Sequence, residues 1–168
     1  IAGNVMEWYD FAVYGYFAPI IGRQFFPSDD PTASLIAAFG VFAAGFLARP
    51  FGGIIFGHIG DKLGRKKALV ISVAMMAIPT FLIGLLPGHA QWGAAAAMVL
   101  VILRLLQGLS VGGEYTSSIT FLVEHAKGNN RGFMASWAIF GAIGGIMLGS
   151  AVGATITNLM SEQAGNDW

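Results

Sequence analysis

The sequence predicts an all-α fold: a polytopic membrane bundle of five transmembrane helices that form a single domain over residues 1–168. Hydrophobic residues make up 55% of the chain and charged residues only 11%, whereas soluble domains average about 45–50% and about 25%. Apolar runs of about 20 residues, the length that crosses about 30 Å of hydrocarbon, recur along the chain. A soluble helical bundle would need polar outer faces, and the third and fifth runs have almost no polar residues to supply them.

The five predicted spans follow one another, separated by short polar segments. The first, 3–22, is ended by a turn-rich segment with two prolines and two aspartates. The second, 34–59, is followed by a basic loop, and the third, 68–86, ends at a Pro-Gly pair. The fourth, 93–123, precedes a second polar loop, and the fifth, 132–159, is followed by a polar tail. The first run contains two acids and has no basic residue before it, which argues against a signal peptide.

Charge and composition exclude several classes of function. Nine basic residues balance nine acidic ones, so no net positive field attracts nucleic acid. The chain has no cysteine, which excludes disulfides, thiol nucleophiles and zinc–thiolate sites. We expect no metal site, because the three histidines have no second ligand at a suitable spacing. We expect no enzyme activity either, because no histidine lies at mid-depth to activate a serine.

The distribution of basic residues predicts the orientation. The loops 61–67 and 124–131 contain six of the nine lysines and arginines, and the opposite side contains only Arg23. Because basic loops stay in the cytoplasm, we expect a multi-pass protein of the inner (cytoplasmic) membrane. The N-terminus and both basic loops would then be cytoplasmic, and the end after the fifth span would be outside.

Charged and polar side chains inside the spans are the strongest functional signal. Each buried charge costs on the order of 2.5–3.5 kcal/mol on insertion scales, so such residues usually line a cavity or pair with one another. Arg104 is predicted to lie roughly 16 Å from the outer end of its span, near the midplane. The candidate transport and proton-coupling residues are Glu7, Asp10, Arg49, Arg104, Gln107, Glu114 and Tyr115. They form either a polar cavity for protons or a charged solute, or interhelical ion pairs that only fix packing.

Glycines recur every four residues within three of the spans. Such stripes let helix backbones approach closely, so they predict packing contacts and surfaces on which helices can rock. The stripes are Gly53 and Gly57, then Gly108 and Gly112, and finally Gly141, Gly145, Gly149 and Gly153.

Five segments of the sequence resemble a known family or one of its branches. Segment 57–67, GHIGDKLGRKK, closely resembles the loop between helices two and three of the major facilitator superfamily. Segment 104–108, RLLQG, is similar to the R-x-x-Q-G motif of the same superfamily. Segments 3–11, 46–53 and 131–137 look like the metabolite:proton symporter branch, which includes transporters of proline and betaine, 2-oxoglutarate, citrate and shikimate.

The resemblance assigns roles to individual residues of the loop and of the fourth span. Asp61 would match the acid that clasps the opposite half of the transporter, and Arg65 its charged partner. Gly57 and Gly64 would match the packing and turn glycines of this conformational-gating loop. Arg104 would match the fourth-helix arginine linked to proton coupling. Members have twelve spans, so this chain resembles an N-terminal fragment that lacks one helix of the first half and the whole C-terminal half.

The resemblance implies a secondary active transporter that couples uptake of a small polar metabolite to proton entry by alternating access. The proton would be the coupling ion, with no cofactor, and the lipid bilayer and the missing half would be the partners. The substrate stays open, because the arginines suit a carboxylate, whereas Trp8, Tyr9, Tyr14 and Tyr115 suit a quaternary ammonium. The alternative is a non-transporting integral membrane protein, such as a receptor or an assembly subunit.

Overall fold

The computed structural model describes residues 2–124, 126 and 130–166, apart from the side chains of 2, 115–117 and 160–166. This part of the chain is helical and contains no strand, which confirms the all-α prediction. The helices are α1 (Ala2–Phe25), α2 (Pro31–Leu63), α3 (Arg65–Leu85), α4 (His89–Trp92), α5 (Ala94–Glu124) and α6 (Arg131–Asn166). Each of the five long helices contains one predicted span, and only the single turn α4 was not expected.

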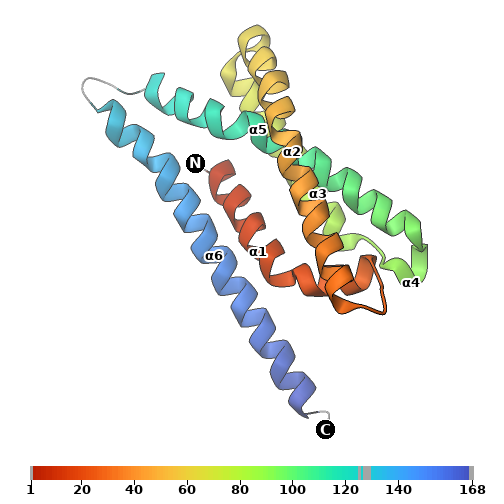
Figure 1. The fold of residues 1–168 in the computed structure, drawn as a ribbon. Coiled ribbons are helices and arrows are strands. Elements are labelled where there is room, and N and C mark those ends of the chain that lie inside the picture. The colour runs from red at the N-terminus through yellow and green to blue at the C-terminus, as the bar shows by residue number, and fades with distance from the viewer. Residues whose placement is uncertain (1, 125, 127–129, 167–168) are drawn as a thin grey trace.

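The long helices run alternately in opposite directions (Figure 1). The start of α1, the α2–α3 junction, the end of α5 and the start of α6 lie at one end, and the α1–α2 connection, α4 and the end of α6 lie at the other. α5 packs mainly against α2 and α3, and α6 packs mainly against α1. α1 therefore lies between α6 on one side and the α2–α5 pair on the other.

By length and composition, four helices of the described chain can cross a membrane: α2, α3, α5 and the part of α6 up to Leu159. α1 is 24 residues long but is not among them. Its polar residues Asn4, Glu7 and Asp10 lower its hydropathy, and they are buried or half-buried between helices. The first predicted span, 3–22, which lies in α1, thus remains a prediction.

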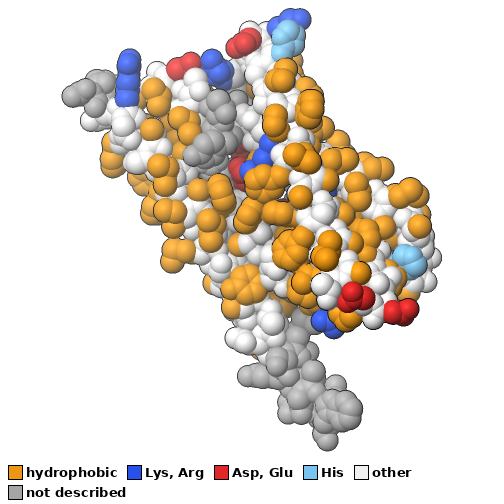
Figure 2. All heavy atoms as spheres, viewed as in Figure 1, with side chains coloured by type: hydrophobic (Ala, Val, Ile, Leu, Met, Phe, Trp, Pro, Cys, Tyr) orange, Lys and Arg blue, Asp and Glu red, His pale blue; other side chains and the backbone are white. Residues whose placement is uncertain are grey.

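The surface between the two ends is apolar. Charged side chains gather at the ends of the molecule, and hydrophobic side chains cover most of the face between them (Figure 2). Leu47 on α2 and Phe140 on α6, for example, leave 74% and 66% of their surface exposed. Large apolar side chains are exposed in such numbers on proteins that are surrounded by lipid rather than by water.

The α2–α3 junction is shorter than predicted. The expected loop 61–67 is helical on both sides of a single residue, Gly64, which has φ 90° and ends α2 with a hydrogen bond from its N–H to the carbonyl of Gly60. Asp61 consequently belongs to the last turn of α2 and Arg65 begins α3. A positive φ of this kind favours glycine, since a Cβ would clash with the backbone.

Two of the three glycine stripes make close helix contacts. A Cβ added to Gly108 or Gly112 on α5 would collide with the backbone of α2, and one added to Gly149 on α6 would meet the Tyr9 carbonyl of α1 at 2.7 Å. Of the stripe on α2, a Cβ added to Gly53 would lie 3.4 Å from the Gly112 carbonyl of α5, whereas one added to Gly57 would have nothing within 4 Å, so the predicted packing contact is not seen at Gly57. Gly57 lies on the outer side of α2, where the described chain offers it no partner.

Candidate functional site

Two arginine–carboxylate pairs meet between α1, α2 and α5. Arg104 Nη1 lies 2.7 Å from Asp10 Oδ2, and Arg49 Nη1 lies 3.2 Å from Glu7 Oε1. Glu7 and Asp10 are three residues apart on α1, so one face of that helix presents both acids. The side chains of Glu7 and Arg104 are only 4% and 9% exposed, so both pairs are largely shielded from the surroundings.

Each arginine also stacks on an aromatic ring. The Arg49 guanidinium carbon lies 3.7 Å from the centre of the Phe46 ring, and the Arg104 carbon lies 3.9 Å from the centre of the Tyr14 ring. The Phe42 ring stacks on Tyr14 with 5.2 Å between centroids. Such cation–π contacts strengthen when water is excluded, so ring and acid together fix the position of each guanidinium.

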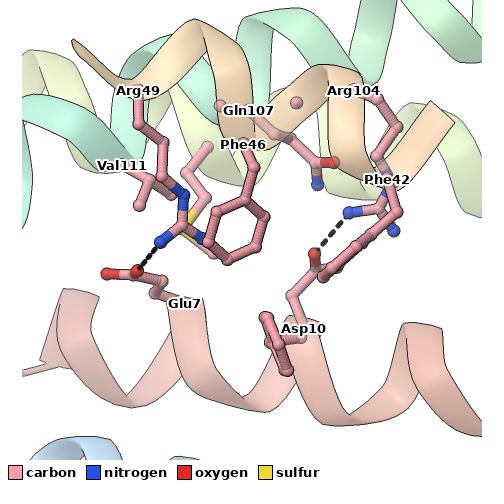
Figure 3. Close-up of a pocket in the computed structure, with 12 residues that line it drawn as sticks. Glu7, Asp10, Phe42, Phe46, Arg49, Arg104, Gln107 and Val111 are labelled. Carbon is pink, nitrogen blue, oxygen red and sulfur yellow. Dashed lines mark hydrogen bonds and ion pairs between the residues drawn. The ribbon is translucent and has the colours of Figure 1, made fainter. Parts of the chain in front are cut away.

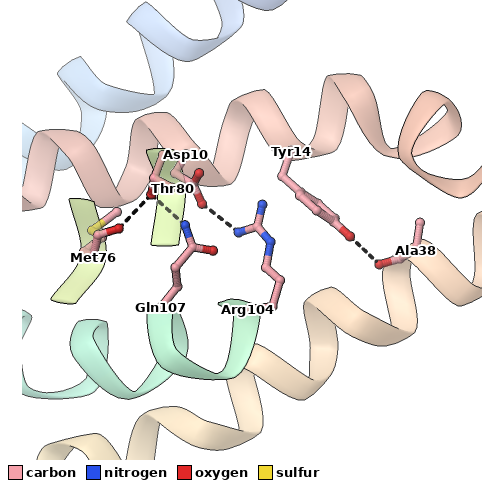
Figure 4. A network of polar contacts seen from close by, with 7 residues as sticks. All are labelled: Asp10, Tyr14, Ala38, Met76, Thr80, Arg104 and Gln107. Atoms are coloured by element: carbon pink, nitrogen blue, oxygen red, sulfur yellow. Dashed lines mark hydrogen bonds and ion pairs between the residues drawn. The ribbon is translucent and has the colours of Figure 1, made fainter. Parts of the chain in front are cut away.

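Further hydrogen bonds lie on both sides of the Arg104–Asp10 pair (Figure 4). Gln107 donates from Nε2 to Thr80 Oγ1 at 2.6 Å, and Thr80 donates to the Met76 carbonyl at 2.9 Å. On the other side of the pair, the Tyr14 hydroxyl donates to the Ala38 carbonyl at 2.8 Å. Four helices, α1, α2, α3 and α5, thereby contribute to one polar network within an apolar bundle.

Both ion pairs line one pocket, and the rings of Phe42 and Phe46 lie beside them (Figure 3). The cavity volume is about 30 Å³, enough for a water molecule or two but not for a metabolite. A wider groove of about 530 Å³ adjoins it and shares Glu7 and Arg49 with it. Trp8 lines this groove as well. The polar centre is thus nearly closed in this conformation and opens towards one side.

A third acid, Glu114, lies beside these pairs without joining them. It is 2% exposed, and its carboxylate lies against the backbone of Gly3 on α1. Glu7 follows Gly3 by one helical turn, and the carboxylates of Glu7 and Glu114 interact electrostatically. Asn4 is also buried and donates from Nδ2 to the Ala138 carbonyl of α6 at 3.0 Å, which ties this end of α1 to α6.

Several buried polar atoms at the site have no hydrogen-bond partner among the described residues. Two donors, Trp8 Nε1 and Arg49 Nε, belong to residues that line the wider groove. Arg104 Nε and Gln107 Oε1 lie at the inner pocket. Unpaired buried groups are costly, so these atoms are available for water or a polar ligand.

The gating residues predicted from the loop are placed at the end of the bundle, away from the pocket. Arg65 Nε lies 3.4 Å from Glu124 Oε1 of α5, and the two side chains are 40% and 49% exposed. The expected alternative, a pair between Arg65 and Asp61, is therefore not what the structure shows. Asp61 is exposed, and the described residues offer it no ion pair.

The structure brings together most of the predicted site residues and adds others. Five line the inner pocket: Glu7, Asp10, Arg49, Arg104 and Gln107. Glu114 lies next to them, and the side chain of Tyr115 falls outside the described residues. The sequence reasoning missed Asn4, Phe42 and Thr80. Asn4 and Thr80 are polar residues within apolar runs, a signal that could have found them, whereas Phe42 is one of many aromatic residues.

Comparisons with known proteins agree with this architecture. A family model described as "Sugar (and other) transporter" matches residues 1–168. The chain is 46% identical over 166 residues to the proline/betaine transporter of Salmonella typhimurium (strain LT2) and 44% identical over 167 residues to the alpha-ketoglutarate permease of Escherichia coli (strain K12). It is 39% identical over 167 residues to the citrate-proton symporter of Klebsiella pneumoniae.

Each of these alignments covers 99% of this chain but only 33%, 39% and 38% of the respective relative. The chain therefore spans between a third and two fifths of the length of the curated relatives that it matches. No solved structure matches it. The family match over the whole sequence confirms the resemblance drawn from the motifs, and the chain belongs to the sugar (and other) transporter family of the major facilitator superfamily.

Proposed function

We propose that this chain is part of a secondary active transporter that couples uptake of a small polar metabolite to proton entry across the cytoplasmic membrane. The observation that carries the proposal is the meeting of two arginine–carboxylate pairs in one pocket inside an apolar bundle. Glu7 and Arg49 also border a groove of about 530 Å³, which supports access of a solute to the charged pairs. Carriers of this architecture bind their solute near the midplane and rock around it.

The Asp10–Arg104 pair supports a coupling mechanism. Ionised Asp10 holds Arg104 at 2.7 Å. Protonated Asp10 cannot neutralise the guanidinium, so Arg104 becomes free to bind an anionic group of the solute. Return of the proton to the cytoplasm restores the pair and displaces the solute. Each inward proton contributes about 2.3 kcal/mol per 100 mV of membrane potential. This free energy drives accumulation of the solute when proton transfer at Asp10 and solute binding at Arg104 are coupled in the same carrier.

The contacts at the site favour a solute with a carboxylate. Both arginines face the inner pocket, and the names of the relatives include proline, betaine, alpha-ketoglutarate and citrate. The Tyr14 ring, in contrast, already contacts the Arg104 guanidinium and the Phe42 ring. A quaternary ammonium would therefore have to displace Arg104 to reach that ring. We accordingly propose that the arginines bind a carboxylate of the solute, and that Tyr14 does not bind a cationic group.

The arrangement of the ends supports the membrane topology. We place the N-terminus and residues 61–67 and 124–131 in the cytoplasm, because the start of α1, the end of α2 and the end of α5 lie at the same end of the bundle (Figure 1). The two segments contain six of the nine basic residues, and basic segments stay in the cytoplasm. At this end Asp61 is exposed and unpaired among the described residues. It is thus available to the other half of the transporter, which we propose as the partner that it clasps.

Uptake by the full-length protein tests the proposal. In cells expressing it, Arg104→Ala and Asp10→Asn should each abolish proton-driven accumulation of a labelled dicarboxylate, proline or betaine, compared at two external pH values. Arg23→Ala is the matched control, because Arg23 is an exposed arginine at the far end of α1 and should leave uptake unchanged. Accumulation at the unmutated level in both site variants would remove the coupling mechanism, and no uptake of any of these solutes would favour a non-transporting membrane protein.

A further inference from the structure

The charges enclosed by α1, α2 and α5 do not balance. Two arginines, Arg49 and Arg104, face three acids, Glu7, Asp10 and Glu114. If all five were ionised, this region would hold one uncompensated negative charge. An unpaired charge away from water is far more costly than a paired one, so the cluster reaches neutrality most readily by holding one proton.

The ion pairs show which acid lacks a counter-charge. Arg104 is held by Asp10 at 2.7 Å and Arg49 by Glu7 at 3.2 Å. Glu114 forms no ion pair with an arginine or lysine of the described chain, although it is the most deeply buried of the three acids at 2% exposure. Its Oε2 atom has no hydrogen-bond partner among the described residues, so no donor in that part of the chain stabilises a negative charge on this oxygen.

The surroundings of Glu114 provide acceptors rather than donors. Glu7 Oε2 and Asn4 Oδ1, both on the neighbouring part of α1, are also buried and without a donor. Together with Glu114 Oε2, three buried oxygen atoms of α1 and α5 are thus without a donor among the described residues. A protonated carboxyl is itself a donor, so one proton would both remove the excess charge and supply a missing hydrogen bond.

We propose that Glu114, together with Glu7, forms a second protonation site, distinct from the Asp10–Arg104 pair, and that Glu114 holds the proton in the conformation described here. The proposal rests on the proposed function and assigns this acid a separate role within it. On α1 the charged group that interacts with Glu114 is Glu7, which is in turn paired with Arg49 of α2. The basic residues of α3 and α6 in the described chain lie in the first turns of those helices, at Arg65, Lys66, Lys67 and Arg131.

Loss of this proton would change the contact between α1 and α5. Glu7 on α1 and Glu114 on α5 would then both be ionised and would repel each other. The Glu114 carboxylate lies against the backbone of Gly3 on α1, so this repulsion acts where the two helices are in contact. Protonation of Glu114 therefore favours close packing of α1 against α5, and this links the proton to a change in helix packing.

Infrared spectroscopy of the purified full-length protein in liposomes tests the proposal independently of transport. The wild type should show the C=O band of a buried protonated carboxyl group at neutral pH, and a rise in pH should remove it. Glu114→Gln keeps the shape of the side chain and should abolish this band, whereas Glu124→Gln, the control, removes an exposed acid of the same helix and should leave the band unchanged. A band that persists in Glu114→Gln overturns the proposal.

Two further outcomes separate this proposal from neighbouring ones. If the oxygen atoms bind Na⁺ instead of a proton, the wild type lacks the band, and NaCl but not choline chloride raises its thermal stability; this too overturns the assignment. In uptake assays, Glu114→Gln should flatten the dependence of transport on external pH while solute exchange continues. If the wild type transports nothing, the proposed function fails, but the infrared band still decides the protonation of Glu114.

Discussion

Removing one partner of the Asp10–Arg104 pair should destabilise the protein strongly. Asp10→Asn keeps the size of the side chain and removes its charge, so Arg104 would remain 8% exposed with no anion at 2.7 Å. Breaking a buried ion pair from one side costs about 3–5 kcal/mol, because the remaining charge stays buried without compensation. That loss corresponds to roughly two to three and a half orders of magnitude in the folding equilibrium.

The chain offers a matched control for this prediction. Glu124→Gln removes the acid of an exposed ion pair. In that pair Arg65 Nε lies 3.4 Å from Glu124 Oε1, and the two side chains are 40% and 49% exposed. Exposed pairs contribute at most about 1 kcal/mol. Thermal unfolding of the full-length protein in detergent should therefore show a large loss for Asp10→Asn and a small one for Glu124→Gln.

A double variant checks the physical reason for the loss. Asp10→Asn with Arg104→Gln leaves two neutral side chains that can hydrogen-bond, so it should regain most of the stability that Asp10→Asn alone removes. Equal losses for Asp10→Asn and Glu124→Gln, or a double variant less stable than the single one, would refute the argument that uncompensated buried charge is the cause.

Two further predictions concern packing and topology. Gly108→Ala should lower thermal stability by about 1–3 kcal/mol, because its Cβ would collide with the α2 backbone at Gly45, whereas Gly57→Ala should cost nothing, since nothing lies within 4 Å of the added atom. In a cysteine-free background, Asp29→Cys should react with a membrane-impermeant maleimide on intact cells and Lys62→Cys only after permeabilisation; labelling of the reverse pattern would contradict the proposed orientation.

The long helices could be predicted from the sequence because membrane spans depend on local composition. Each apolar run had to be about 20 residues long, and prolines, glycines or charges marked its ends. The predicted third span, 68–86, for example, falls almost wholly within α3, Arg65–Leu85. The junction at Gly64 was predicted less well. The basic residues of segment 61–67 indicated a loop, but the chain is helical on both sides of Gly64.

The pairing of the charged residues could not be predicted to the same degree. The spacing of Glu7 and Asp10 showed that they share a face of α1, but only the packing of three helices decides that Arg49 meets Glu7 and Arg104 meets Asp10. Likewise, Gly57 belongs to the same sequence pattern as Gly108, yet only Gly108 faces another helix. Partners distant in the chain depend on helix rotation, which no local pattern determines.

The single residue between α2 and α3 limits how these helices can move. Two Cα–Cα steps join Leu63 to Arg65 through Gly64, so the facing ends of the helices can separate by no more than about 7.6 Å. Any tilting of α2 must therefore move the start of α3 with it, because the single connecting residue allows no further separation. The ends of α2 and α3 that meet at Gly64 therefore stay together, and the two helices can separate only at their opposite ends.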